Sequence, residues 1–302
     1  MEPSRRELIG AGLAAALGAA TRSVPAASVS SRPAVGGGKI GPHLRLSLAA
    51  YSLRQYLPSE KGPGKITLHD LLELCAVWGT DALEPTSYYF TSEDRAYLHS
   101  LKAKAFRLGL DISGTAVRND FCVPPGPQRE RELAHVRRWV DHAVELGAPV
   151  IRVFAGKRAG DREEDFARVV DGLRHACDYA GSHGVFLAIE NHGYLTENAA
   201  DVLRIVETVG HEWLGVNLDT GNFQRDGYES IRTVAPRAIT VQVKVAVRDA
   251  EGREQPADFR RIIGILRDAN YRGYVALEYE AKEDPMTAVP AYLARLREAL
   301  EA

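Results

Sequence analysis

This chain of 302 residues contains few cysteines and carries little net charge. The three cysteines, Cys75, Cys122 and Cys177, are widely spaced and form no Cys-x-x-Cys pair, so neither a disulfide framework nor a thiolate zinc site is expected. Thirty-eight lysines and arginines stand against forty aspartates and glutamates, which gives a formal net charge of −2. This balance offers no electrostatic surface for a nucleic-acid backbone, so nucleic acid is not an expected partner.

Long hydrophobic runs are also missing. An uncharged run at 8–21, rich in Gly and Ala, is too short to span a bilayer comfortably. It overlaps Ser4-Arg5-Arg6-Glu7-Leu8-Ile9, which resembles a twin-arginine export signal. We therefore expect a signal peptide at 1–27, a flexible linker at 28–43, the twin-arginine export machinery as a partner, and a periplasmic or secreted protein without a stable membrane anchor. The alternative is a frayed N-terminal helix.

From residue 44 onward, short β-rich runs alternate with longer amphipathic runs, which is the pattern of repeated βα units. Eight pairs predict an α/β fold, a single (β/α)8 TIM barrel over 44–302. No Gly-rich phosphate turn follows an early strand, which disfavours a doubly wound open sheet. Strands are expected at 45–50, 81–83, 111–116, 150–154, 186–190, 214–219, 239–245 and 273–278. Helices are expected at 67–78, 92–108, 128–146, 162–183, 196–209, 228–234, 257–269 and 288–301.

Several predicted helices carry start and stop signals. Thr67 and Asp70 form the pattern of a capping box, and Ser92 and Thr196 are placed as N-cap residues. A glycine that can adopt a left-handed C-cap follows four of the helices. These glycines are Gly79, Gly109, Gly147 and Gly184.

The strand ends carry the candidate chemistry, because a β/α barrel builds its active site at the C-terminal ends of its strands. Three mostly apolar strands each end in one carboxylate, and a fourth supplies an amide and an amine. These residues are Glu190, Asp219 and Glu278, with Gln242 and Lys244. Carboxylates that converge at the mouth of an apolar barrel repel one another and resist ionisation unless a cation offsets the cost. A divalent metal ion fits this need.

The alternative is a network of salt bridges between these carboxylates and side-chain cations. The candidate cations are Lys244, Lys282, Arg152 and Arg118.

Four segments make the chain resemble the xylose isomerase-like barrel superfamily of sugar isomerases and epimerases, which includes the sugar phosphate isomerase/epimerase family and tagatose 3-epimerase-type enzymes. They span 188–193, 217–222, 241–244 and 276–280. The resemblance implies one divalent ion held by Glu, Asp, His and Glu, and the matching positions are Glu190, Asp219, Gln242 and Glu278. It also implies that Glu190 and Glu278 exchange protons with the substrate from opposite sides.

Two positions depart from the family pattern. Gln242 stands where the epimerases usually place a ligating His, and Asn222 stands where they often have a His that contacts the substrate. A glutamine that ligates through its amide oxygen favours Mn²⁺ or Mg²⁺ over Co²⁺ or Zn²⁺. Alternatively, Gln242 only lines the pocket. His192, just beyond a strand end, is expected either to bind substrate or to orient Glu190.

Further side chains near the strand ends are expected to bind substrate. The set is His192, Asn222, Lys244, Arg152, Glu84 and Tyr51. Tyr88 to Phe90 could stack on a sugar, and the loop at 119–128, with three prolines, is expected to form a stiff wall. No phosphate cradle is evident, so a neutral sugar or glycoside is the expected small-molecule partner.

Three functions remain open from the sequence. The first is a divalent-metal-dependent sugar isomerase or epimerase that abstracts a proton next to a carbonyl through a metal-stabilised enediolate. The second is a metal-dependent lyase that cleaves a keto-glycoside by β-elimination. The third is a non-catalytic periplasmic sugar-binding barrel. The sequence does not choose between isomerisation and epimerisation, and it leaves a homo-oligomer open.

Overall fold

The computed structural model describes residues 41–59 and 62–302. The predicted signal peptide at 1–27 lies outside the described residues, and only 41–43 of the predicted linker at 28–43 lie within them. Within the described residues, no helix combines the length and the apolar character needed to cross a membrane.

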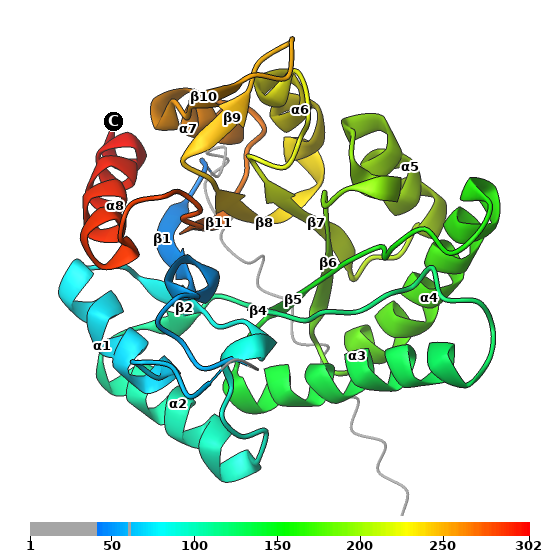
Figure 1. Cartoon of the computed structure of the whole chain (residues 1–302), viewed down its shortest axis with the longest axis horizontal. Coiled ribbons are helices and arrows are strands. Elements are labelled where there is room, and N and C mark those ends of the chain that lie inside the picture. The colour runs from blue at the N-terminus through cyan, green and yellow to red at the C-terminus, as the bar shows by residue number, and fades with distance from the viewer. Residues whose placement is uncertain (1–40, 60–61) are drawn as a thin grey trace, which may run out of the picture. The chain divides into compact units, whose positions relative to one another are not determined.

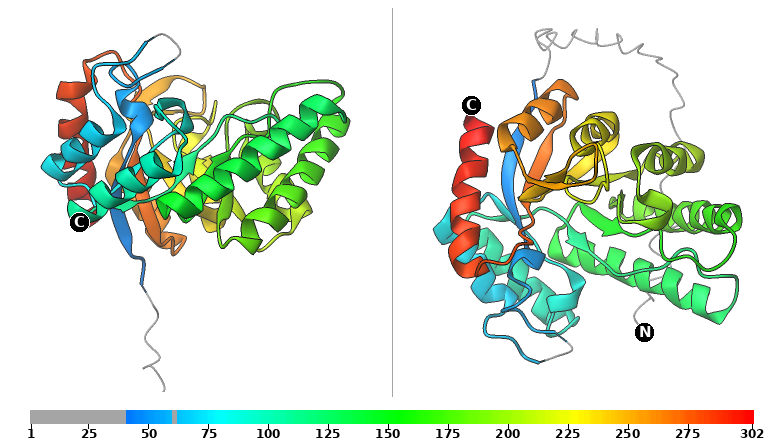
Figure 2. Two further views of the ribbon diagram at one scale, coloured as in Figure 1. Left: turned by 90° about the horizontal axis from the view of Figure 1, so that it is seen from below. Right: turned by 45° about the horizontal axis from the view of Figure 1, so that its top comes forward.

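The described chain folds as a ring of parallel strands with helices around the outside (Figures 1 and 2). The strands of the ring are β1 (Leu44–Ala49), β2 (Ala82–Glu84), β3 (Asp111–Ile112), β4 (Thr115–Ala116), β5 (Val150–Val153), β6 (Phe186–Glu190), β7 (Leu214–Asp219), β8 (Ala238–Val243) and β11 (Gly273–Leu277). The helices are α1 (Leu68–Trp78), α2 (Arg95–Arg107), α3 (Pro127–Leu146), α4 (Arg162–Ser182), α5 (Ala199–Val209), α6 (Gly227–Val234), α7 (Phe259–Asp268) and α8 (Pro285–Glu301). The predicted (β/α)8 barrel is confirmed.

The ring closes through the segment predicted as one strand at 111–116. Its first half, β3, pairs with β2, and its second half, β4, pairs with β5. The break falls at Gly114, where a Cβ would lie 2.8 Å from Val150 Cγ1. The strand order β3-β2-β1-β11-β8-β7-β6-β5-β4 therefore begins and ends in this single segment.

A hairpin interrupts the connection between β8 and α7. It consists of β9 (Ala246–Arg248) and β10 (Glu254–Pro256), which pair antiparallel. The strand predicted at 239–245 therefore ends at Val243, and the chain turns away before the hairpin. The hairpin packs against the start of α6, where a Cβ on Gly227 would lie 2.3 Å from Val247 Cγ1.

The predicted helix starts are confirmed at one position and shifted at two. Thr67 and Asp70 form the capping box of α1. The N-cap of α2 is Asp94 rather than Ser92, because the Ser92 hydroxyl accepts from the Asp94 backbone N–H and so belongs to the preceding turn. The N-cap of α5 is Asn198 rather than Thr196, because Thr196 lies in a 3-10 turn that follows β6.

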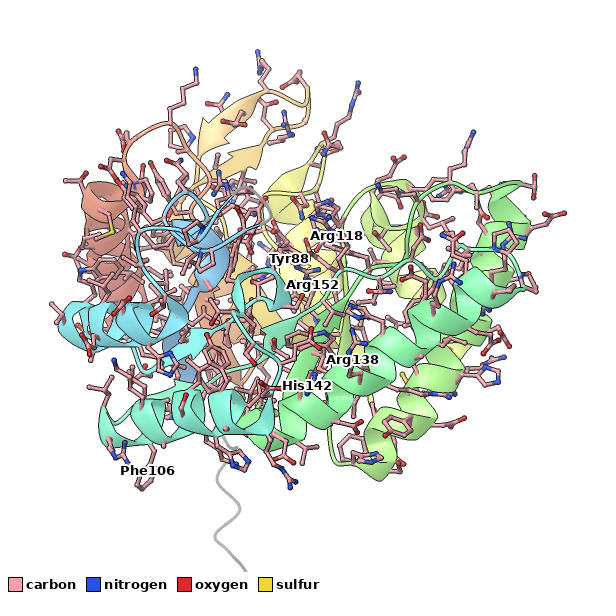
Figure 3. The ribbon with its side chains drawn as sticks, turned by 60° about the horizontal axis from the view of Figure 1, so that its bottom comes forward. Tyr88, Phe106, Arg118, Arg138, His142 and Arg152 are labelled. Carbon is pink, nitrogen blue, oxygen red and sulfur yellow. The ribbon has the colours of Figure 1, made fainter. Side chains whose placement is uncertain are left out.

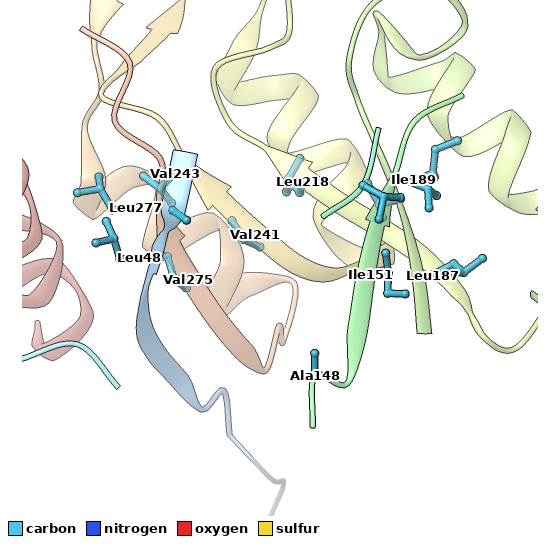
Figure 4. Close-up of a cluster of buried hydrophobic side chains, with 14 of the residues drawn as sticks. Leu48, Ala148, Ile151, Leu187, Ile189, Leu218, Val241, Val243, Val275 and Leu277 are labelled. Carbon is cyan, nitrogen blue, oxygen red and sulfur yellow. The ribbon is translucent and has the colours of Figure 1, made fainter. Parts of the chain in front are cut away.

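Side chains alternate between the two faces of the barrel strands. One face packs against the helices and forms a buried apolar layer that includes Leu48, Ile189, Val241 and Leu277 (Figure 4). The other face fills the barrel interior and carries many polar side chains. Its buried polar members are Ser47, Glu84, Ser113, Thr115, Arg152, Asn217, Thr240 and Gln242. They tolerate burial because several bond to one another across the ring, as Ser47 and Ser113 do at 2.8 Å.

Candidate active site

A cavity of about 630 Å³ opens at the C-terminal ends of the strands. Its lining includes six of the predicted site residues, namely Tyr51, Arg152, Glu190, His192, Lys244 and Glu278. Glu84, Asp219, Asn222 and Gln242 are not part of this lining. The volume suits a small-molecule ligand, and the two predicted catalytic carboxylates reach it together.

Glu190, the last residue of β6, is surrounded by nitrogen atoms. Arg152 Nε on β5 lies 2.9 Å from Glu190 Oε2 and forms a buried ion pair with it. On the other oxygen, Oε1, the Asn222 amide donates at 2.9 Å and His192 Nδ1 lies 3.1 Å away. His192 and Asn222 therefore orient Glu190, which was one of the two roles predicted for His192.

Lys244 stands among the remaining carboxylates. Its Nζ donates to Glu278 Oε1 at 2.9 Å, lies 3.4 Å from Asp219 Oδ2, and also donates to Glu280. Asp219 Oδ1 accepts backbone N–H groups from Gly221 at 2.8 Å and Asn222 at 3.1 Å. The ammonium thus lies between the ends of β7 and β11 and joins their carboxylates.

The surroundings shift the pKa values of the two cavity glutamates in opposite directions. Burial acts to raise the pKa of Glu190, but the charges of Arg152 and His192 outweigh it and hold that pKa below its ordinary value. Burial raises the pKa of Glu278, against the opposing effect of Lys244. Ionisation is therefore favoured at Glu190 and opposed at Glu278, relative to an ordinary glutamate.

Two further carboxyls beneath the cavity have raised pKa values. Burial raises the pKa of Asp219 to about 7, although Lys244 opposes the shift. Burial, with the nearby charge of Glu278, raises the pKa of Glu84 to about 7. The carboxylate cluster is therefore not fully compensated by the cations of the chain.

Gln242 is held inside the barrel by two side chains. Its amide nitrogen donates to Glu84 Oε1 at 2.6 Å, and its oxygen accepts from the Asn217 amide at 2.7 Å. Because Glu84 accepts from the amide nitrogen, the Gln242 oxygen is directed toward Asn217. Gln242 and Glu84 therefore bridge the ring below the cavity, and neither reaches the cavity wall that substrate would contact.

These contacts test whether the predicted ligands fit a divalent ion. Glu190 faces Arg152, Gln242 is bonded to Asn217, and the space between Asp219 and Glu278 holds the ammonium of Lys244. Within 41–59 and 62–302, no three or more His, Cys, Asp or Glu side chains are arranged to hold a metal ion. As the side chains lie, the predicted metal set does not fit the ion. The observed ion pairs of Arg152 and Lys244 correspond to the network of salt bridges that the sequence analysis gave as the alternative to a metal site.

The rest of the cavity wall comes from loops. Figure 3 labels Tyr88, Arg118 and Arg152, which lie together on one side of the cavity, with the Arg118 guanidinium 4.9 Å from the Tyr88 ring centre. The loop predicted as a wall contributes Asn119, Asp120 and Gln128. Of the four candidate cations, Lys244 and Arg152 join the carboxylate network, Arg118 stacks on Tyr88, and Lys282 is exposed.

Sequence reasoning missed three residues of this site. Glu280 contacts Lys244, and its position two residues after Glu278 could have indicated this, since both follow the same strand. Asn191 exchanges two hydrogen bonds with the Asp219 backbone, at 2.9 and 2.8 Å. Asn217 fixes Gln242. The contacts of Asn191 and Asn217 link neighbouring strands and have no local sequence signal.

A family model described as xylose isomerase-like TIM barrel matches residues 72–299. The chain belongs to this family. A D-psicose 3-epimerase of Agrobacterium fabrum is 32% identical over 226 residues, which are 68% of this chain and 77% of that protein. This barrel therefore belongs to a group that contains sugar epimerases and isomerases.

Solved structures agree on the fold. A D-psicose 3-epimerase crystallised in the presence of D-fructose superposes with a TM-score of 0.69 at 20% identity, covering 85% of this chain and 97% of that one. A xylose isomerase-like TIM barrel protein from Mycobacterium smegmatis in complex with magnesium gives 0.66 at 18% identity, covering 85% and 97%. At these identities the likeness concerns the barrel alone.

Proposed function

We propose that this chain is a sugar isomerase or epimerase that moves a proton at the carbon next to a carbonyl, with Glu190 and Glu278 as the acid/base pair. One observation carries the proposal. Two carboxylates from β6 and the end of β11 line one cavity, and their pKa values are shifted in opposite directions. Paired titratable groups whose surroundings drive their pKa values apart are the usual basis of acid and base roles in one site.

The ionised Glu190 is the group suited to accept the proton. The C–H electron pair moves toward the carbonyl, whose oxygen becomes negatively charged, and Lys244 and Arg152 supply positive charge at the cavity wall. Glu278, whose pKa is raised by burial, returns a proton from its side of the cavity. Return to the same carbon from the opposite face gives an epimer. Return to the former carbonyl carbon, with the neighbouring hydroxyl giving its proton to the negatively charged oxygen and becoming the new carbonyl, gives an isomer.

The substrate class follows from the lining. The cavity combines hydrogen-bonding groups with the aromatic rings of Tyr51, Tyr88 and Phe154, a mixture suited to a hydroxylated carbon skeleton. The similar D-psicose 3-epimerase was crystallised in the presence of D-fructose, which supports a neutral sugar as ligand. Asn222, predicted to bind substrate, donates a hydrogen bond to Glu190 at 2.9 Å.

The family resemblance implies a divalent ion, and one structural neighbour is a magnesium complex. The contacts of Lys244 and Gln242 do not leave the predicted ligands arranged for such an ion, and the proton transfer above uses groups of the chain alone. Nothing in the site favours the keto-glycoside lyase or the non-catalytic binder over the epimerase or isomerase.

The test is turnover of a panel of free ketoses that begins with D-fructose, D-tagatose and D-psicose. We expect a new sugar of unchanged mass, separated by chromatography, and loss of this product in the Glu190→Gln variant. Cleavage of a keto-glycoside with release of its aglycone would instead identify a lyase. Binding of a sugar without any change in it would identify a binding protein.

We also propose export by the twin-arginine route, supported by the segment at 4–9 and the uncharged run that follows it. The test is cell fractionation of the full chain beside a variant with Arg5→Lys and Arg6→Lys. We expect the double variant to accumulate in the cytoplasm. Equal export of both proteins would contradict the proposal.

A further inference from the structure

The Lys244 ammonium occupies the space that a divalent ion bound by Asp219 and Glu278 would need. Its Nζ lies 2.9 Å from Glu278 Oε1 and 3.4 Å from Asp219 Oδ2, and its side chain is only 9% exposed. Asp219 is fully buried and does not line the cavity, whereas Lys244 does. The lysine therefore covers Asp219 from the cavity side.

The path of the lysine side chain depends on a glycine. A Cβ at Gly221 would lie 2.6 Å from Lys244 Cγ and 2.7 Å from its Cβ, contacts too close for a real carbon pair. The Lys244 backbone N–H donates to the Thr220 hydroxyl at 2.9 Å, which fixes the start of the side chain. The turn after β7 thus leaves room for the lysine stem as it passes toward the carboxylates.

The other members of the predicted metal set are already paired with groups of the chain. Arg152 neutralises Glu190, and the Gln242 oxygen accepts from Asn217 while its nitrogen donates to Glu84. A divalent ion between Asp219 and Glu278 would stand within a few ångströms of an ammonium, and like charges at such a distance inside a protein repel strongly.

We propose that Lys244 is the built-in cation of this cluster, and that a divalent metal ion binds Asp219 and Glu278 only by displacing the lysine. The ammonium and the metal ion then compete for the same two carboxylates. Removing the positive charge opens an oxygen-rich site of the kind that Mn²⁺ or Mg²⁺ prefers. This inference concerns cation binding and does not depend on the reaction proposed above.

The experiment is titration of metal-free full-length protein with MnCl2, with free Mn²⁺ measured by electron paramagnetic resonance. Wild type is compared with Lys244→Met, which removes the charge and keeps the stem, and with Lys244→Arg, which keeps a cation. Lys282→Met controls for loss of an exposed lysine.

We expect Lys244→Met to bind one Mn²⁺ per chain at least about tenfold more tightly than wild type, since like charges repel. Lys244→Arg and Lys282→Met should bind Mn²⁺ no more tightly than wild type. Equal or weaker binding by a folded Lys244→Met protein would overturn the proposal.

A second measurement follows thermal unfolding with and without millimolar MnCl2 at matched ionic strength, because an ion that binds only the folded chain raises the Tm. We expect the rise for wild type to be smaller than the rise for Lys244→Met. A rise for wild type that equals the rise for Lys244→Met, and that the Asp219→Asn substitution abolishes, would show that the lysine does not compete with the ion and would overturn the proposal. Both readouts are binding measurements, so failure here is distinguishable from failure of the ketose assay.

Discussion

Arg152 and Glu190 form a buried ion pair between neighbouring strands, with Arg152 Nε 2.9 Å from Glu190 Oε2. A second nitrogen of Arg152 donates to the Val117 carbonyl at 2.9 Å, which fixes the guanidinium in place. Burial alone would raise the pKa of Glu190, and Arg152 is the main group that reverses this. The arginine thus favours the ionised form of the proposed base although its side chain is buried.

Replacing Arg152 changes the pH dependence of turnover. In Arg152→Met, burial remains while the compensating charge is lost, so the pKa of Glu190 rises and the acid limb of the kcat/KM profile moves to higher pH. Arg152→Lys retains a charge and should shift the limb less. A rate lost at all pH values with an unmoved acid limb would contradict this role. Tm is measured in parallel, because breaking a buried ion pair also destabilises the fold.

The two cavity glutamates are each expected to be needed for turnover. Glu190→Gln and Glu278→Gln keep the shape of the side chain and remove its proton-transfer ability, so each should lower kcat by about 10²–10⁴-fold. Glu212→Gln, at an exposed position before β7, is the control and should retain activity. Near-normal kcat in either cavity variant, in protein with unchanged circular dichroism, would remove that residue from the acid/base pair.

Gln242 is expected to stabilise the barrel rather than to hold a metal ion. Gln242→Leu leaves Glu84 and Asn217 without their partner inside the barrel, and a buried polar group left unpaired costs about 1–3 kcal/mol. Urea unfolding should therefore show a loss of stability of this size. Unchanged stability together with weaker Mn²⁺ binding would identify Gln242 as a ligand instead.

Asp165 links pH to stability away from the cavity. Its buried carboxylate accepts from the Tyr194 hydroxyl at 2.7 Å and from the backbone N–H groups of Ala159 and Gly160 at 3.0 and 3.2 Å. Although burial opposes the shift, these bonds and Arg168 lower the pKa of Asp165 to about 2. Because the pKa is lower in the folded chain, the stabilisation is complete above the ordinary pKa near 3.8 and is lost as the pH falls toward 2.

Asp165→Asn should therefore reduce the free energy of unfolding by about 2 kcal/mol at neutral pH. Denaturant unfolding of both proteins across the acid range checks this, and the difference between them should shrink between pH 3.8 and about 2. The exposed Asp178→Asn change should cost much less. A difference between Asp165→Asn and wild type that is constant with pH would show that ionisation is not its source.

Much of the architecture could be predicted from local patterns. The apolar runs before Glu190, Asp219 and Glu278 form strands, as their residue pattern predicts. The three carboxylates lie at one rim of the ring, because repeated βα units place the C-terminal ends of all strands on the same side. The hairpin of β9 and β10 was missed because its strands are only three residues long, too short to show a period. The break at Gly114 depends on Val150 of the next strand, which local pattern does not reveal.

The site was harder to predict than the fold, because its chemistry depends on pairings between distant residues. Gln242 is held by Glu84, 158 positions away in sequence, so a strand-end glutamine does not reveal where its oxygen is directed. Lys244 was predicted to contact substrate or, in the alternative, to pair with the carboxylates, and which carboxylates it contacts depends on the positions of three strands. The family resemblance indicated which residues belong to the site, and the fold determines which of these residues contact one another.

Hydrogen exchange at the substrate is the most direct test of the proposed chemistry. The protein is incubated with D-fructose, D-tagatose and D-psicose in D₂O, and the sugars are examined by NMR for deuterium at the carbon next to the carbonyl. We predict that wild type incorporates solvent deuterium at that carbon in the ketose it converts, and that Glu190→Gln does not. Conversion of a ketose with full retention of its original hydrogen at that carbon would contradict proton transfer by these two glutamates.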